Sequence, residues 1–308
     1  MQIKAISISS KKGEKKKNID KANIKDNYGI IGDAHAGYLH RQVSFLAEKS
    51  IQKMRELGLD VKPGDFAENI VLDNIDSSDI NVGDNLIVND VKFTITQKGK
   101  ICHNRCNIYY KVGDCIMPRE GFFTIVKGDG TIKVGDKVEY IKKTKYTASI
   151  ITLSDKGFKG EREDKTGPLL HEYLSKNFDF SFIRYDMIPD EKKILQDLFE
   201  DLIFQQKIDL IITNGSTGVT KRDIAPDVTI ETIERRLLGY EEAMRMESFE
   251  KTPHGIISRC VCGIKEESLI INLPGSPKAA LENITTISGA IMHTLNKIKG
   301  DNEDCGSM

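Results

Sequence analysis

A polar loop of small residues at positions 213–223 has the residue types that phosphate chemistry requires. It reads TNGSTGVTKRD and follows an apolar run at residues 208–212, the pattern of a buried strand that ends in a loop. Small residues let the backbone approach a ligand, and the N–H groups of such a loop can cradle a phosphate. Arg222 can neutralise phosphate charge, and Asp223 can hold a metal ion that faces the phosphate. No Gly-Lys-Ser/Thr sequence ends the loop, so it is not a Walker loop, and a plain turn with an Arg–Asp ion pair is the alternative.

Three other apolar runs also end in small or acidic residues. Asp190 and Glu191 follow one run, where capping of a helix by Asp190 is the alternative interpretation. Ser154 and Asp155 follow a second run and offer a hydroxyl and a carboxylate. Residues 274–276, Pro-Gly-Ser, follow a third run, where a turn before a helix is the alternative. One shared crevice explains these strand ends better than a set of independent turns does.

The cysteines of the first half form a second chemically distinctive group. Cys102 and Cys106 flank His103, and Cys115 follows further along the chain. Three thiols and an imidazole are compatible with zinc, although no second cysteine pair follows at zinc-finger spacing. A reactive thiol is another interpretation, because basic neighbours such as Arg105 lower the pKa of a thiol. The third interpretation is that the thiols are buried in the core and serve packing alone.

The elements that must position the polar loops alternate between strand and helix after residue 145. The apolar runs predict strands at residues 147–153, 182–188, 209–213 and 269–273. The segments between them predict helices at residues 167–177, 190–206, 228–238 and 279–298. This alternation predicts an α/β three-layer sandwich with a mostly parallel sheet between two layers of helices. In such folds ligands bind beyond the carboxyl ends of the strands, where the polar loops begin.

The first half of the chain has a different sequence pattern, in which short β-rich runs alternate with Gly-Asp and Asn-Asp turns. Strands are expected at residues 85–88, 91–95, 121–126 and 137–141, and one helix at residues 44–58. The pattern is typical of an antiparallel β barrel or sandwich. We therefore expect a mainly β domain at residues 1–143, a second domain at residues 146–300 and a polar tail at residues 301–308.

Length and composition limit the class of protein. A chain of 308 residues has room for two ordinary domains, and 39% hydrophobic with 30% charged residues is typical of a globular protein. The formal net charge of -1 gives no field that attracts nucleic acid or an anionic membrane, so neither is an expected partner. The first residues lack the apolar segment of a secretory signal, and no apolar run approaches the ~20 residues that span a bilayer. We expect a cytoplasmic protein, in which six cysteines do not form a disulfide framework.

In sequence and order, the polar loops of the second half resemble those of the molybdopterin adenylyltransferase family (the MogA and MoaB proteins and the matching domain of gephyrin-like proteins). The resemblance covers residues 147–300 and rests on the segments at 154–155, 164–168, 188–191, 213–229 and 273–277. It implies that Asp190 and Asp223 are the catalytic carboxylates and hold Mg²⁺. It also implies that the substrates are bound by Ser154, Asp155, Thr213, Gly215, Ser216, Thr217, Gly218, Arg222, Pro274, Gly275 and Ser276.

The polar loop at residues 213–223, called the central loop below, departs from the family at one position. The family usually has two adjacent glycines where this chain has Gly215 and Ser216. A serine there either narrows the pocket or adds a hydrogen bond to the pterin, and the sequence leaves both alternatives open. The two acidic positions are unaffected by the departure.

The resemblance implies a reaction in which the terminal phosphate of molybdopterin attacks the α-phosphorus of Mg-ATP and pyrophosphate leaves. Such chemistry depends on positioning and charge neutralisation. The resemblance also implies a homotrimer and, as downstream acceptor, a molybdenum-insertion protein. A non-catalytic pterin-binding or scaffold protein is the alternative, which the presence of both acidic residues disfavours. An unrelated nucleotide-binding domain is disfavoured by the missing Walker and dinucleotide fingerprints.

The first half of the chain resembles the MOSC domain, a β barrel that carries sulfur or binds molybdenum cofactor. The resemblance covers about residues 1–142 and rests on the segments at 32–35, 64–69, 82–84, around 102 and at 135–136. The single cysteine of that family corresponds best to Cys102, and Cys106 and Cys115 leave open which thiol acts. His35 is a further candidate for the same thiol or cofactor site, with a simple turn as the alternative.

Overall fold

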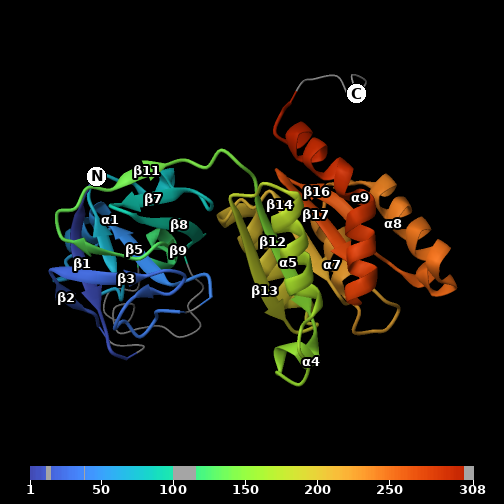
Figure 1. Ribbon diagram of the computed structural model, residues 1–308, viewed down its shortest axis with the longest axis horizontal. Coiled ribbons are helices and arrows are strands. Elements are labelled where there is room, and N and C mark those ends of the chain that lie inside the picture. Colours follow the sequence, from blue (N-terminus) through green and yellow to red (C-terminus); the bar gives the residue numbers. More distant parts are fainter. Residues whose placement is uncertain (12–14, 38, 100–115, 302–308) are drawn as a thin grey trace. The chain divides into compact units, whose positions relative to one another are not determined.

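The computed structural model describes residues 1–11, 15–37, 39–99 and 116–301. The chain divides into two compact units, Met1–Thr144 and Lys145–Met308, which are coloured from blue to green and from green to red in Figure 1. Across these described ranges, no helix is both long enough and apolar enough to cross a membrane.

The N-terminal unit is mainly β. Its larger sheet has the strand order β11-β7-β8-β9-β5-β6-β1-β2, and a smaller sheet has the order β10-β3-β4. Neighbouring strands are antiparallel except for the parallel pair β5 and β6. The larger sheet is formed by β1 (Ile3–Ile8), β2 (Lys17–Ile19), β5 (Val43–Ala47), β6 (Ile70–Leu72), β7 (Asn85–Val88), β8 (Val91–Lys98), β9 (Phe122–Lys127) and β11 (Glu139–Ile141). The smaller sheet is formed by β3 (Lys21–Lys25), β4 (Gly29–Ile30) and β10 (Gly130–Lys133), and the helical segments are α1 (Glu48–Glu56), η1 (Ser77–Asp79) and α3 (Met117–Glu120).

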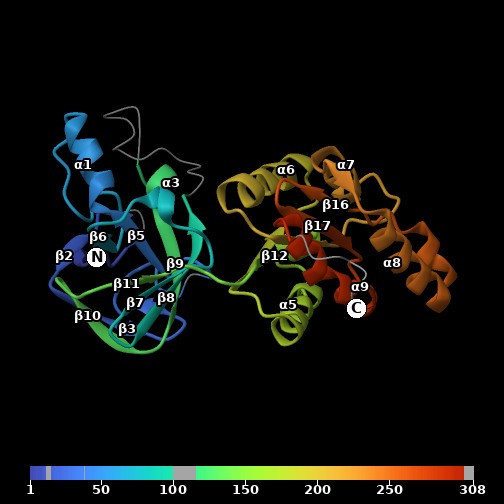
Figure 2. The same ribbon diagram turned by 90° about the horizontal axis from the view of Figure 1, so that it is seen from above.

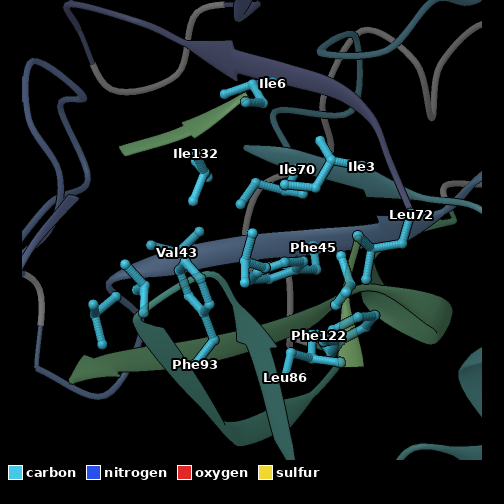
Figure 3. Packing of buried hydrophobic residues seen from close by; sticks show 14 of the residues in the cluster. Ile3, Ile6, Val43, Phe45, Ile70, Leu72, Leu86, Phe93, Phe122 and Ile132 are labelled. Carbon is cyan, nitrogen blue, oxygen red and sulfur yellow. The ribbon is translucent and has the colours of Figure 1, made fainter. Parts of the chain in front are cut away.

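Aromatic and branched side chains from several of these strands pack into one core (Figure 3). The ring of Phe45 stacks on that of Phe122 with centroids 5.3 Å apart, and it meets the ring of Phe93 edge-on at 5.4 Å. Such ring pairs add about 0.5–1.5 kcal/mol beyond the area that they bury. These three rings fix β5, β8 and β9 against one another at the centre of the larger sheet.

The prediction of a helix at residues 44–58 is wrong in its first turn. Residues 43–47 form β5, which pairs with β6 on one side and β9 on the other, and the helix α1 begins only at Glu48. All five residues of β5 are buried, and periodicity cannot separate a fully buried strand from a buried helix. In the described part of this unit, β11 and β2 are the edges of the larger sheet, so its closure into a barrel remains a prediction.

The C-terminal unit is an α/β sandwich around a six-stranded sheet with the order β13-β12-β14-β17-β16-β15. The first four strands are parallel, and β16 and β15 are antiparallel, which confirms the prediction of a mostly parallel sheet. The strands are β12 (Thr147–Leu153), β13 (Phe182–Ile188), β14 (Leu210–Asn214), β15 (Arg235–Arg236), β16 (Cys262–Lys265) and β17 (Ser268–Leu273). The helical segments are α4 (Asp155–Phe158), α5 (Thr166–Asn177), α6 (Lys192–Glu200), η2 (Asp201–Gln205), α7 (Ala225–Thr232), α8 (Leu238–Lys251), η3 (Pro253–Ile257) and α9 (Pro277–Ile298).

Helices cover both faces of this sheet. Figure 2 shows α5 and α9 on one face and α6 and α7 on the other, while α8 packs against α9. Every residue of the central strands β12, β14 and β17 is buried, as expected for parallel strands covered on both faces.

The predicted helix at residues 228–238 is wrong at its C-terminal end. The helix α7 ends at Thr232, and residues 235–236 form the edge strand β15, which pairs with β16. The helix α8 has no counterpart among the predicted helices, because it buries only two side chains. One of them, Glu241, is buried because Arg236 and Arg245 neutralise it, a contact that no periodic pattern reveals.

The order of the strands brings the polar loops together. The chain passes from β12 to β13 on one side and then to β14 on the other side of β12, so the connections diverge at β12. In the pairing register, Leu153 lies beside Ile188, and Asn214 lies beside both Thr152 and Leu273. The loops that follow these four parallel strands therefore begin next to one another, at the place where doubly wound sheets bind ligands.

Candidate functional site

A cavity of about 910 Å³ lies at the carboxyl ends of β12, β13, β14 and β17. Its wall includes most of the residues that the sequence singled out, from all four loops. These are Ser154, Asp155, Asp190, Gly215, Ser216, Thr217, Gly218, Arg222, Asp223, Gly275 and Ser276. Four separate polar segments thus border one space, and that space is of the size that small-molecule ligands occupy.

Asp155 joins three of the loops. Its backbone N–H donates to Asp190 Oδ2 at 3.0 Å, and its own Oδ1 accepts from the backbone N–H of Asp190 at 3.1 Å. The guanidinium of Arg222 donates to both oxygens of Asp155, and also to Glu191 Oε1 at 2.9 Å. The Arg222 side chain lowers the pKa of Asp155, so this carboxylate stays ionised.

The carboxylate of Asp190 does not cap its own helix. The N-cap of α6 is Glu191, one residue later, and the predicted helix start at 190 shifts to Lys192. Asp190 instead reaches across to the loop after β12. Helix capping was the alternative interpretation of this residue, and the structure assigns its side chain to the cavity wall.

Two residues with a left-handed backbone conformation lie at the start of the central loop. Gly215 has φ of 91°, and a Cβ added there would lie 2.5 Å from the carbonyl oxygen of Leu153, so only glycine fits. Ser216 also has a positive φ, 56°. Its Oγ donates to the carbonyl oxygen of Arg222 at 3.0 Å and accepts from the N–H of Ile224 at 2.8 Å. The hydroxyl thus bridges the beginning and the end of the loop.

Asp223 closes the far end of the same loop. Its Oδ2 accepts from the backbone N–H of Thr220 at 2.8 Å, and a Cβ added to Gly218 would lie 2.9 Å from that oxygen. Partial burial raises the pKa of Asp223, but hydrogen bonds from Thr220 and Gly218 outweigh it, and the net pKa is below the usual value. The side chain is therefore an anion at neutral pH, as a ligand of a divalent cation must be.

A segment that the sequence had not assigned to the site, residues 162–166, forms another part of the wall. Asp164 Oδ2 accepts from the hydroxyls of Thr152 at 2.6 Å and Tyr185 at 2.7 Å, while its Oδ1 accepts from the N–H of Thr166 at 2.9 Å. Arg162 donates to Ser154 Oγ at 2.9 Å. The segment at 164–168 was visible as part of the family resemblance, but charged residues on an irregular segment gave no independent signal.

Two of the expected binding residues do not line the cavity. Thr213 is completely buried in β14, where its Oγ1 accepts from Asn272 Nδ2 at 2.9 Å. Asn272 also donates to Thr229 Oγ1 at 2.9 Å and so ties β17 to α7 beneath the site. Pro274 stands between β17 and the wall residues Gly275 and Ser276.

In the N-terminal unit, Cys102, Cys106 and Cys115 lie outside the described residues. His35 is described, and its Nδ1 lies 3.4 Å from Lys16 Nζ and 3.5 Å from Asp33 Oδ1. Lys16 and Asp33 form an ion pair of 2.5 Å whose side chains are each 1% exposed, whereas His35 is 36% exposed. His35 is thus the accessible end of a buried charged group, and not only a residue of a turn.

The donor set of the cavity fits a Mg²⁺ ion that is shared with a triphosphate. Such ions take one or two carboxylates from the protein and complete their octahedral shell with phosphate oxygens and water. Asp190 and Asp223 offer carboxylates from two different loops of the same cavity. Within the described ranges, no group of three or more His, Cys, Asp or Glu side chains could hold a metal by itself.

Fold and cavity together define the class of the C-terminal unit, a doubly wound α/β domain with a ligand crevice beyond its parallel strands. A family described as a probable molybdopterin binding domain matches residues 149–293, and the MOSC domain matches residues 32–139. The molybdopterin adenylyltransferase of Helicobacter pylori is 35% identical over 156 residues, which are 49% of this chain and 87% of that protein. The chain therefore belongs to the molybdopterin adenylyltransferase family through its C-terminal half.

Other relatives are longer than the shared region. The molybdenum cofactor synthesis protein cinnamon of Drosophila melanogaster is 32% identical over 155 residues, which are 50% of this chain and 26% of that protein. This chain thus spans about a quarter of the length of that relative. Among solved structures, the molybdopterin biosynthesis enzyme MoaB of Thermus thermophilus is 37% identical, with a TM-score of 0.47 and coverage of 51% of this chain and 98% of that chain.

Proposed function

We propose that the C-terminal unit transfers the adenylyl group of ATP to the terminal phosphate of molybdopterin. A phosphate oxygen of molybdopterin forms a bond to the α-phosphorus, the bond from that phosphorus to the β-phosphate oxygen breaks, and pyrophosphate leaves with the electron pair. The main support is that Asp190 and Asp223 border one cavity together with loops rich in backbone N–H groups. The enzyme names of the curated relatives support the same reaction.

In this proposal the side chains of the cavity position and neutralise charge. Asp190 and Asp223 would hold Mg²⁺, which would supply charge neutralisation for the triphosphate. The N–H groups of Ser216 and Thr217 bind phosphate oxygens, and Arg222 exchanges its contact with Asp155 for a phosphate group. No general base is required, because the attacking phosphate is already an anion.

The decisive experiment measures pyrophosphate release by the full chain with molybdopterin, labelled ATP and Mg²⁺. We expect Asp190→Asn and Asp223→Asn each to lower the rate by about a hundredfold or more, since each removes a charge that neutralises the reacting groups. Asp197→Asn is the matched control, because Asp197 lies in an i,i+4 ion pair with Lys193 on α6 and outside the cavity wall. A wild-type protein that binds molybdopterin without releasing pyrophosphate is a scaffold protein, and this result rejects the proposal.

We also propose a role for the N-terminal unit, as a module that binds molybdenum cofactor or carries sulfur on Cys102. The match to the MOSC domain supports this role, and the accessible His35 is the described residue assigned to the site. Mass spectrometry of the purified protein distinguishes the two forms, because a persulfide adds sulfur to a cysteine peptide and a bound cofactor does not. A protein that lacks both modifications after production with molybdate contradicts the proposal.

The assembly and the partner belong to the same proposal. We propose a homotrimer in the cytoplasm that delivers adenylylated molybdopterin to a molybdenum-insertion protein, as the resemblance of the polar loops to the molybdopterin adenylyltransferase family implies. Light scattering of the full chain measures the mass directly, and a monomer at micromolar concentration excludes the trimer.

A further inference from the structure

Arg259 contacts the central loop from outside the cavity. It lies between η3 and β16 and is not part of the cavity wall. Its Nε donates to the carbonyl oxygen of Gly218 at 2.7 Å, and its Nη2 donates to the carbonyl oxygen of Asp223 at 2.5 Å. Its backbone N–H also donates to the carbonyl oxygen of Thr217 at 3.0 Å. Arg259 thus contacts both the first part of the loop, at Thr217 and Gly218, and its end, at Asp223.

The guanidinium of Arg259 is itself fixed by a carboxylate. Its Nη1 donates to both oxygens of Asp227, in α7, at 2.9 and 3.1 Å. All three nitrogens of the guanidinium are therefore engaged, each with a different partner. A planar fork of donors can bridge two carbonyl groups and a carboxylate at once, which the point charge of a lysine cannot do.

The residues between these two contact points include side chains that act in the proposed reaction. The stretch from Gly218 to Asp223 includes Arg222, and it has no helix or strand of its own to hold it. Within the loop, the hydroxyl of Ser216 and the turn from Thr220 to Asp223 supply hydrogen bonds. The contacts from Arg259 attach this stretch to the β16 side of the sheet.

We infer that Arg259 is a positioning residue, which holds the loop so that Asp223 and the loop N–H groups face the reacting phosphates. The catalytic part of this inference rests on the proposed function, whereas the conformational part does not. A group that shifts by about 1 Å in a reaction of this kind can lower the rate about a hundredfold.

Hydrogen exchange of the ligand-free full chain tests the conformational part. We expect Arg259→Gln to raise the exchange rate of residues 218–223 by about tenfold or more, with Arg259→Lys in between and β12 unchanged. Asp227→Asn should change the same peptide in the same direction, because it releases the guanidinium. Arg235→Gln, at an exposed arginine of β15, is the matched control and should leave the loop unchanged. Equal acceleration in every peptide, or a loop that exchanges at the wild-type rate, overturns the inference.

Pyrophosphate release tests the catalytic part with the same variants. We expect Arg259→Gln to lower kcat by about a hundredfold with a smaller change in KM for ATP, and Arg259→Lys to recover part of the loss. Wild-type kcat in Arg259→Gln refutes the positioning role even if the loop is mobile. If the wild-type protein itself releases no pyrophosphate, the proposed function fails, and the exchange rates still decide whether Arg259 holds the loop.

Discussion

The side chain of Ser216 allows the structure of the central loop to be tested with two substitutions. Its hydroxyl bridges the carbonyl of Arg222 and the N–H of Ile224, and its φ of 56° lies in the left-handed region. Ser216→Ala removes both hydrogen bonds and keeps a Cβ in this unfavourable conformation. Ser216→Gly removes the same hydrogen bonds and relieves the backbone.

The expected changes in the free energy of unfolding follow from these two contributions, the hydrogen bonds and the backbone conformation. Two partly exposed hydrogen bonds together contribute about 1–2 kcal/mol, and a non-glycine residue in the left-handed region costs about 1 kcal/mol. We therefore expect Ser216→Ala to lower the free energy of unfolding by about 1–2 kcal/mol. Ser216→Gly should be more stable than Ser216→Ala by about 1 kcal/mol.

The assay is urea unfolding of the full chain, followed by hydrogen exchange in peptides of the C-terminal unit so that its transition is measured separately. The same variants show whether the hydroxyl binds the pterin. A serine hydroxyl has one donor, which is already directed at Arg222, so it cannot donate to a ligand. We expect the hydroxyl to serve the loop and not the pterin, so that the KM for molybdopterin is the same in the wild type and in Ser216→Gly. A Ser216→Ala variant as stable as the wild type, or a large rise in KM for Ser216→Gly, refutes this reasoning.

Further predictions concern other parts of the molecule. Gly167→Ala places a methyl group 2.3 Å from Tyr185 Cε2 and 2.5 Å from Asp164 Oδ2, so calorimetry should show a loss of about 1–3 kcal/mol. Gly289→Ala, in an exposed turn of α9 with no atom within 4 Å, should instead gain about 0.5–1 kcal/mol, and a loss there contradicts the steric explanation. Burial raises the pKa of Glu68 to about 7, so the folded protein binds a proton at this carboxyl more tightly than the unfolded chain does. The stability that this group contributes is therefore present in acid and declines as pH rises toward 7. Urea unfolding should show that Glu68→Gln removes about 2 kcal/mol of this decline between about pH 5 and about pH 8, and an unchanged slope excludes the mechanism.

Much of the C-terminal unit could be predicted because its signals are local. The strand at 182–188 coincides with β13, although Arg184 and Asp186 interrupt its apolar residues. The strand at 147–153 coincides with β12, since it is a mostly apolar run bounded by polar turns. Such runs suit parallel strands that are covered on both faces. Because all parallel strands end at the same edge, the sequence also predicted that their polar loops would meet, as Asp190 and Asp223 do in one cavity.

Other features were invisible in the sequence because they depend on partners far along the chain. The residues of β5 look like the first turn of a helix until β6 and β9 pair with them. The helix α8 buries Glu241, whose carboxylate is paired with Arg236. Arg259 stands 36 residues after Asp223, and nothing in the spacing shows that it contacts the loop.

The sequence by itself determined the two halves, the parallel sheet and the polar residues at its edge, because hydrophobic period and turn residues are properties of short segments. Only the tertiary structure decided which polar groups bind one another. It directed Asp190 to Asp155 instead of its own helix, and Ser216 to the loop backbone instead of the open cavity. The physical reason is that a hydrogen bond is satisfied by the nearest partner in space, and the fold alone decides which partner that is.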